Sequence, residues 1–237
     1  MDSIVNQAAK WSYMFGGKLN APVTIRSIIN RGGSQGAQHS QALHSWFAHI
    51  PGLRVVMPST VEDARDLLIS SVLCPDPVIY IDDRWLYEQT ANLKPIKETP
   101  LKLITPKCLK NGDQITIVGS GYSTNLALKV SKKLNSDGIG AEVFDLRVLN
   151  PFNSENILNS VLKTKRLLVI DSGWKTCGMA SEVITSIVEN IPTNTLIEPP
   201  RRITLPDCPA PSSEVHEKDY YPNEENIIKF INDAYHF

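Results

Sequence analysis

Predicted strands and helices alternate along most of this chain, and this alternation limits the possible folds more than any other feature. Short apolar runs typical of buried strands occur at residues 22–29, 53–57, 78–81, 114–119, 141–145 and 166–171. Helical patterns lie between or after them, at residues 40–49, 61–73, 123–135, 153–163 and 178–190. Strands separated by helices favour parallel sheets covered on both faces, so we expect an α/β protein made of three-layer units.

Two such units joined by a linker are expected. The 237 residues are 42% apolar and 21% charged, which suffices to bury one large core or two smaller ones. Between Asp82 and Asn111 the periodic pattern fades, and Lys, Pro and Thr accumulate. The predicted organisation is therefore a first unit, a linker and a second unit, at residues 1–90, 91–111 and 112–237. We expect the second unit to end with an irregular, proline-rich segment and a helix, at residues 192–222 and about 224–235.

The first unit looks incomplete. It offers only about three strands, fewer than the five or six of an average sheet. A helix predicted at 1–14 carries apolar residues that such a unit would leave exposed, among them Ile4, Val5, Trp11 and Met14. We therefore expect an upstream segment or a partner chain to complete this core.

Charge and cysteine usage exclude several classes of function. The 24 basic and 25 acidic residues give a formal charge of −1 without a long run of either sign, which argues against binding to nucleic acid or an anionic membrane. Cysteines far apart in the sequence predict neither a disulfide framework nor a zinc ribbon: Cys74, Cys108, Cys177 and Cys208. The sequence shows no membrane span and no leader at its start, so we expect a soluble, cytoplasmic protein with reduced thiols.

Three histidines spaced five residues apart, His39, His44 and His49, suggest a metal site at first sight. Five residues turn a helix by about 500°, so the rings would point in different directions, and metal ligation is disfavoured. His39 differs because it lies where a glycine-rich loop gives way to a helix, from which a side chain can face a cleft. We interpret His39 as a functional residue or as a helix-terminus histidine bonded to the loop. We expect His44 and His49 to be structural or interfacial.

A glycine-rich turn at 119–121, with Asp145 ending the next predicted strand, imitates part of a dinucleotide fingerprint. Thr124 stands where the third glycine should be, so we favour a plain strand-to-helix turn over a nucleotide site.

Acidic residues give no compelling catalytic candidate. Asp171, at the carboxyl end of a predicted strand, is the best placed to face a crevice. Glu62 fits a capping box with Ser59, and Glu182 fits the first turn of its helix, where it complements the dipole.

Three motifs carry a resemblance to a known family. G-A-Q-H-S-Q at 36–41, P-G-L-R-V-V-M-P at 51–58 and D-L-R-V-L-N-P at 145–151 occur in this order. They resemble the β subunits of thiamine-diphosphate-dependent 2-oxo-acid dehydrogenases of the pyruvate, acetoin or branched-chain type. The resemblance covers about residues 1–205. The motifs fit a transketolase-like or deoxyxylulose-phosphate-synthase-like enzyme less well.

The resemblance implies an incomplete transketolase pyrimidine-type domain followed by a transketolase C-terminal-type domain. It implies an α subunit that binds the diphosphate and magnesium, a second β copy in an α2β2 assembly, and a lipoyl acyltransferase component as a further partner. The family histidine thought to face the active site matches His39, where it would assist proton transfer or bind the 2-oxo acid. An imidazole suits this role because it exchanges a proton near neutral pH.

One departure from the family concerns the cofactor. The family glutamate that hydrogen-bonds the aminopyrimidine lies in a segment before the one that matches Met1. We therefore assign no cofactor-binding or metal-binding residue, and expect thiamine diphosphate and magnesium to be held mainly by a partner chain and by that segment.

Two functions stay open. The chain is the β half of a decarboxylating dehydrogenase, inactive alone, that acts on a 2-oxo acid such as pyruvate and transfers the acyl group to lipoyl, or it is a truncated, non-catalytic interaction subunit. An upstream targeting segment would place it in the mitochondrial matrix.

Overall fold

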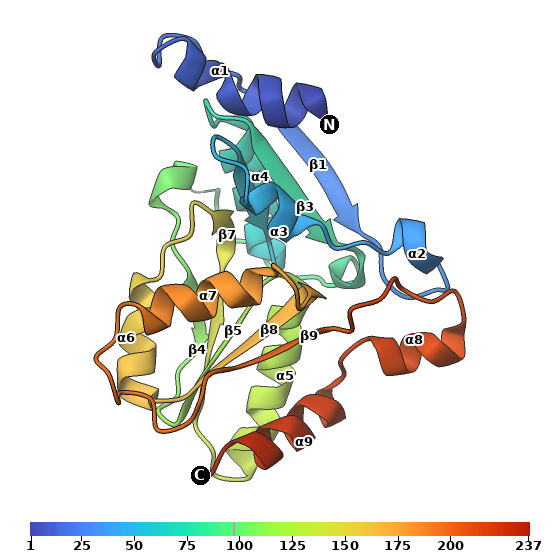
Figure 1. Ribbon diagram of the computed structural model, residues 1–237, viewed down its shortest axis with the longest axis vertical. Helices are drawn as coiled ribbons and strands as arrows, with labels where there is room; N and C mark the ends of the chain where they lie inside the picture. Colours follow the sequence, from blue (N-terminus) through green and yellow to red (C-terminus); the bar gives the residue numbers. More distant parts are fainter. Residues whose placement is uncertain (97) are drawn as a thin grey trace.

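Two β-sheets with helices around them build the protein, as the computed structural model shows for residues 1–96 and 98–237 (Figure 1). The first sheet has the strand order β1-β3-β2-β7, and the second has the order β4-β6-β5-β8-β9. Most strand pairs are parallel, and α-helices connect β1 to β2, β2 to β3, β5 to β6, β7 to β8 and β8 to β9. The predicted α/β class with two parallel-sheet units is confirmed.

The first sheet takes its last strand from the second unit. The predicted strands are present and parallel to one another: β1 (Thr24–Ile29), β2 (Arg54–Met57) and β3 (Val78–Asp83). The fourth strand, β7 (Arg147–Asn150), is antiparallel to β2 and was not predicted. It is short and follows the preceding strand after a single residue, so the sequence shows one run there instead of two. Arg147 begins it with a φ of 64°, which turns the chain away from the second sheet.

The helices of the first unit differ from the prediction in two places. They are a π-helical turn η1 (Ser3–Ala8), α1 (Ala9–Met14), α2 (Gly36–His39), α3 (His44–Ala48) and α4 (Val61–Val72). The helix expected at 40–49 begins only at His44, and a short helix precedes it. Thr60, not Ser59, caps α4, because its Oγ1 accepts a hydrogen bond from the Asp63 amide at 3.1 Å.

The second sheet contains two strands that the sequence did not reveal. Its strands are β4 (Lys107–Lys110), β5 (Ile115–Gly119), β6 (Ala141–Asp145), β8 (Leu167–Trp174) and β9 (Arg201–Leu205). β4 falls in the predicted linker at 91–111, of which residue 97 lies outside the described residues, and β9 falls in the segment predicted as irregular. Both lie at the edges of the sheet and carry polar residues, so neither forms an apolar run.

Helices cover both faces of the second sheet. They are α5 (Tyr122–Ser136), α6 (Glu155–Thr164), α7 (Met179–Val188), α8 (Glu214–Tyr220) and α9 (Glu224–Ala234). α8 lies in the proline-rich segment and was not predicted. Short 3-10 turns, η2 (Arg84–Leu86) and η3 (Leu101–Leu103), follow β3 and precede β4.

One apolar core is shared by the two units. Ile79 and Ile81 of the first sheet belong to the same buried cluster as Val118 and Val169 of the second sheet, with Val183 of α7. A second cluster lies between the second sheet and the helices α5 and α9. Each buried aliphatic side chain contributes about 1.5–3 kcal/mol. The shared core therefore fixes the two sheets against each other, with α7 between them (Figure 1).

No helix in the described part of the chain has the length and apolar character that crossing a membrane requires.

Candidate functional site

His39 lies on the segment that leads from the carboxyl end of β1 to α3. It is the last residue of α2, and its side chain is exposed. Residues 40–43 after it are not helical. Figure 1 shows α2 at the side of the molecule, next to α8. The motif histidine thus faces outward at the edge where the parallel strands β1 and β3 end, the usual place for a site in an α/β sheet.

Contacts with the second unit hold α2 in place. Gly36 begins α2 with a φ of 72° and is buried, and a Cβ built there would lie 2.5 Å from Ser212 Oγ. A side chain at this position would therefore be strained by its positive φ and by a clash with Ser212. The amide of Ser34 donates a hydrogen bond to Glu217 Oε2 of α8 at 3.0 Å. The motif glycine is needed because α2 packs closely against the chain around α8.

A buried ion pair anchors the beginning of the segment. Arg31 Nη2 lies 2.5 Å from Asp83 Oδ2 at the end of β3, and the two side chains are 4% and 0% exposed. The guanidinium also lies 5.3–5.9 Å from the ring centres of Trp85, Tyr122 and Tyr221. Burial raises the pKa of the Asp83 carboxyl, against the opposing effect of Arg31. A cation of the first unit thus sits among aromatic rings contributed in part by the second unit.

His44 marks the other end of the segment and is buried between the two units. Its Nε2 donates a hydrogen bond to Asp171 Oδ1 at 2.8 Å. Asp171, at the end of β8, also accepts hydrogen bonds from the amides of Gly173 and Ala180. Burial acts to raise the pKa of Asp171, but His44 and these donors hold it below its ordinary value. This pair joins residues 127 positions apart, and sequence reasoning did not connect them.

The three histidines do not form one site. His39 and His49 are exposed on different helical segments, whereas the His44 ring is buried. Among the described residues, no three His, Cys, Asp or Glu side chains lie together in a way that could hold a metal ion.

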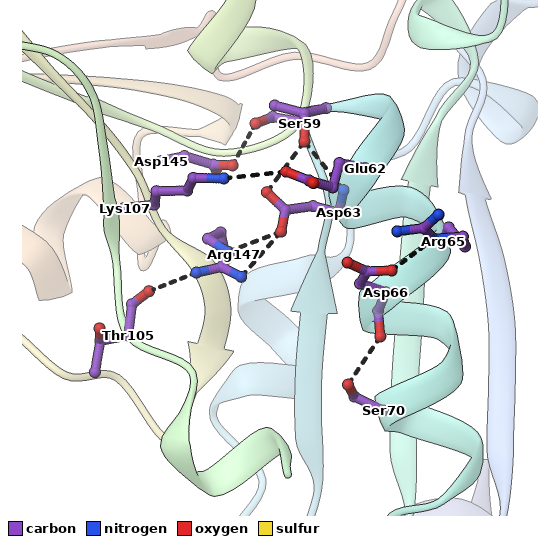
Figure 2. Close-up of polar contacts among 11 residues, drawn as sticks. Ser59, Glu62, Asp63, Arg65, Asp66, Ser70, Thr105, Lys107, Asp145 and Arg147 are labelled. Atoms are coloured by element: carbon purple, nitrogen blue, oxygen red, sulfur yellow. Dashed lines mark hydrogen bonds and ion pairs between the residues drawn. The ribbon is translucent and has the colours of Figure 1, made fainter. Parts of the chain in front are cut away.

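The glycine-rich turn before α5 is filled by the first unit. Gly121 has a φ of 53°, and a Cβ there would lie 2.4 Å from Met57 Cε. Asp145, fully buried beyond this turn, accepts a hydrogen bond from Thr124 Oγ1 at 3.2 Å and a short one from Ser59 Oγ (Figure 2). Burial raises the pKa of Asp145 to about 7. Met57 of the first unit therefore packs directly against the glycine-rich turn of the second unit.

Ion pairs extend the same contact along α4. Arg147 of β7 lies 2.9 Å from Asp63 Oδ1 and donates a hydrogen bond to the Thr105 carbonyl (Figure 2). Glu62 pairs with Lys107 of β4 at 3.6 Å, and the capping box predicted with Ser59 is absent because Thr60 is the N-cap of α4. Ser59 and Glu62, which were expected to cap α4, instead contact Asp145 and Lys107 of the second unit.

Comparisons with known proteins follow the same division. Residues 1–89 match the model of the transketolase pyrimidine binding domain, and residues 106–227 match that of the transketolase C-terminal domain. A solved structure described as a split gene transketolase, inactive beta4 tetramer, superposes with a TM-score of 0.78. The superposition covers 98% of this chain and 71% of that one, with 20% sequence identity, and it shows that the two share a fold. Fold and sequence thus define a transketolase-type two-domain protein.

Similar curated proteins narrow the family. The chain is 36% identical to the β subunit of the pyruvate dehydrogenase E1 component of Rickettsia bellii, covering 98% of this chain and 70% of that one. It is 36% identical to the β subunit of acetoin:2,6-dichlorophenolindophenol oxidoreductase of Bacillus subtilis, and the match covers 96% of this chain and 66% of that one. A mitochondrial pyruvate dehydrogenase E1 β subunit of Caenorhabditis elegans is 34% identical, and the match covers 98% of this chain and 66% of that one. The chain belongs to the family of pyruvate and acetoin dehydrogenase E1 β subunits, and it spans about two thirds of the length of these relatives.

Membership of this family implies thiamine diphosphate as the cofactor. The described residues provide no metal centre of their own for that group, because no three His, Cys, Asp or Glu side chains among them lie together in a way that could hold a metal ion. Three buried aspartates are also engaged: Asp83 with Arg31, Asp145 with Ser59, and Asp171 with His44. None of the three is free to face a cofactor ring.

Proposed function

We propose that the chain acts as the β subunit of the first component of a 2-oxo-acid dehydrogenase complex, with pyruvate as the 2-oxo acid and a lipoyl group as the acyl acceptor. The observation that carries this proposal is the position of His39. It is exposed at the carboxyl edge of the first sheet, on a segment that Arg31 and His44 anchor at its two ends. A residue held in this way keeps its orientation in an assembled enzyme.

His39 is proposed to be the catalytic residue that this chain contributes. Its imidazole exchanges a proton near neutral pH, or hydrogen-bonds the carboxylate of the 2-oxo acid. The cofactor and magnesium are held mainly by an α subunit and by protein outside the described residues, so this chain is inactive alone.

Exposed apolar residues at the beginning of the chain support an α2β2 assembly. Tyr13 is 90% exposed and Met14 is 62% exposed, and Trp11 and Phe15 lie beside them. Large apolar side chains gathered on one helix are typical of a surface that another chain covers. We assign this surface to contacts with the α subunit and the second β copy.

The carboxyl end of the chain is proposed to help dock the lipoyl acyltransferase component. Phe237 is 44% exposed and lies 4.9 Å from the guanidinium of Arg166. Removing the whole of α9 would be a poor test, because Ile227 and Ile231 of this helix belong to the core. We place the protein in the cytoplasm, or in the mitochondrial matrix if the natural chain carries a targeting segment.

Reconstitution tests the proposed function. The natural full-length chain is combined with an α subunit, thiamine diphosphate and magnesium, and acyl transfer to lipoyl is measured. We expect His39→Ala to lower the rate by about 10²–10⁴, the usual effect of losing a positioned acid or base. His49→Ala, another exposed histidine nearby, is the matched control and should stay close to the unmodified enzyme. Equal rates in the two variants would remove His39 from the site. An assembly that forms but transfers no acyl group would favour the non-catalytic interaction subunit.

A further inference from the structure

We propose that His44 is a positioning residue, whose hydrogen bond to Asp171 fixes the segment that carries His39 against the second unit. The inference rests on the proposed function for the role of His39, but the contact itself is a property of this chain. His44 and Asp171 are both buried, and their atoms Nε2 and Oδ1 are 2.8 Å apart.

Asp171 uses both of its oxygens at this contact. Oδ1 accepts from His44 and from the amide of Gly173 at 2.9 Å, and Oδ2 accepts from the amide of Ala180 at 3.0 Å. Without His44, a buried carboxylate would keep only two backbone donors and lose its one side-chain donor. Leaving such a group short of partners is costly, so His44 has a strong reason to stay in place.

The beginning of α7 depends on the same contact. Its N-cap residue is Gly178, which has no side chain that could accept from the free amides of the first turn. Ser45 Oγ of α3 accepts from the amide of Met179 at 2.9 Å, and Asp171 accepts from the next amide. Two adjacent residues of the first unit, His44 and Ser45, therefore satisfy the end of a helix in the second unit, directly and through Asp171.

Close packing leaves the His44 ring little freedom. A Cβ added to Gly173 would lie 3.1 Å from His44 Cε1, so the backbone of the second unit touches the ring edge. The other ring nitrogen, Nδ1, is buried and has no hydrogen-bond partner in the described part of the chain. The orientation of the ring is thus set by the bond from Nε2 to Asp171 and by this packing.

The connection to His39 is short. Four non-helical residues, 40–43, separate α2 from α3, and Ser40 and Ala42 among them are buried. A shift of His44 would therefore be passed directly to the carboxyl end of α2. Arg31 would still hold the beginning of the segment, so the expected result is local loosening and not loss of the fold.

Three variants of His44 separate positioning from simple packing. His44→Gln places an amide N–H close to the position of Nε2 and retains a donor for Asp171. His44→Leu fills similar space without a donor. His44→Asn carries a donor on a side chain that is too short to reach Asp171. His49→Leu serves as the control on an exposed histidine.

Hydrogen exchange of the full-length protein is the main measurement, because it does not require catalysis. We expect His44→Leu and His44→Asn to speed exchange of the amides at 33–43 by about tenfold or more relative to the core strands, and His44→Gln to stay close to the unmodified protein.

In the assembled enzyme His44→Leu and His44→Asn should lower kcat with little change in KM, and His44→Gln should keep kcat close to that of the unmodified enzyme. Unchanged exchange at 33–43 in both His44→Leu and His44→Asn would overturn the proposal, and so would equal effects of His44→Leu and His44→Gln. An enzyme that is inactive in every form would refute the proposed function instead, while the exchange result would still decide the role of His44.

Discussion

Met57 at the end of β2 lies against Gly121 at the start of α5, so closely that a Cβ on the glycine would come within 2.4 Å of Met57 Cε. Met57 has no exposed surface, and Gly121 has a φ of 53°. The last residue of a first-unit strand thus occupies the space above the glycine-rich turn of the second unit. The two units are fitted together here without room for an added methyl group.

Replacement of Gly121 by Ala should therefore destabilise the protein. The left-handed backbone and the contact with Met57 together are expected to lower the free energy of unfolding by about 1–3 kcal/mol, measured by urea unfolding. Gly138→Ala is the matched control, since Gly138 has a φ of 81° but no atom within 4 Å of the added Cβ. Equal losses in the two variants would show that the contact with Met57 contributes nothing.

Asp145 predicts a specific dependence of stability on pH. Its pKa rises from an ordinary 3.8 in the unfolded chain to about 7 in the folded protein. Between these values the folded state binds more protons, so this residue makes the free energy of unfolding fall as the pH rises from about 4 to about 7. Asp145→Asn does not titrate and should reduce the loss of stability between pH 5 and pH 8 by an amount of the order of a few kcal/mol.

Urea unfolding at several pH values measures this effect. Asp233→Asn, at an exposed position on α9, should leave the pH dependence as it is in the unmodified protein. The same pH dependence in the Asp145 variant and the unmodified protein would contradict the assignment of a raised pKa to Asp145.

Arg31→Leu should cost far more stability than the loss of an exposed arginine. It leaves Asp83 buried without its cation, for which about 3–5 kcal/mol is the usual cost. Arg26→Leu is the control, because Arg26 is 52% exposed in its pair with Asp82, and such pairs contribute only about 0–1 kcal/mol. In the double variant Arg31→Leu with Asp83→Asn, part of the loss should be recovered. Arg31→Leu and Arg26→Leu of equal stability would show that the buried pair is not an anchor.

The isolated chain should bind thiamine diphosphate poorly. The described residues contain no group of three His, Cys, Asp or Glu side chains that could hold a metal ion, and the buried Asp83, Asp145 and Asp171 already have partners. Calorimetric titration with thiamine diphosphate and magnesium is expected to show no micromolar binding by this chain alone. Micromolar affinity would mean that a binding site has been missed, and titration after addition of an α subunit provides the comparison.

Long apolar runs allowed most of the fold to be predicted. β6 was predicted with its observed bounds, and β2 and β5 to within one residue, because buried central strands need continuous apolar sequence. β4 and β9 were missed because they are edge strands that carry polar residues, and β7 was missed because it follows β6 after a single residue. Adjacent hydroxyl residues also hid the true cap of α4, since Ser59 and Thr60 each precede an acid by three residues.

The candidate site was predictable only in part. A glycine-rich loop before a helix drew attention to His39, because such patterns are local in the sequence. The anchors Arg31 and His44 could not be recognised in this way, because their partners Asp83 and Asp171 lie 52 and 127 residues away. Asp171 had been noted at the end of a strand, but only the folded chain brings it to His44.

The strand β7 also determines when the first sheet can be finished during synthesis. β2 has to wait for residues 147–150 before its second edge is paired. At ordinary rates of translation, the 60 residues between position 90 and position 150 take roughly 3 to 12 seconds to make. During that time the nascent first unit exposes an unpaired strand edge to the cell, a state that chaperones or a partner chain can bind. The order of synthesis thus delays completion of this unit until much of the second has left the ribosome.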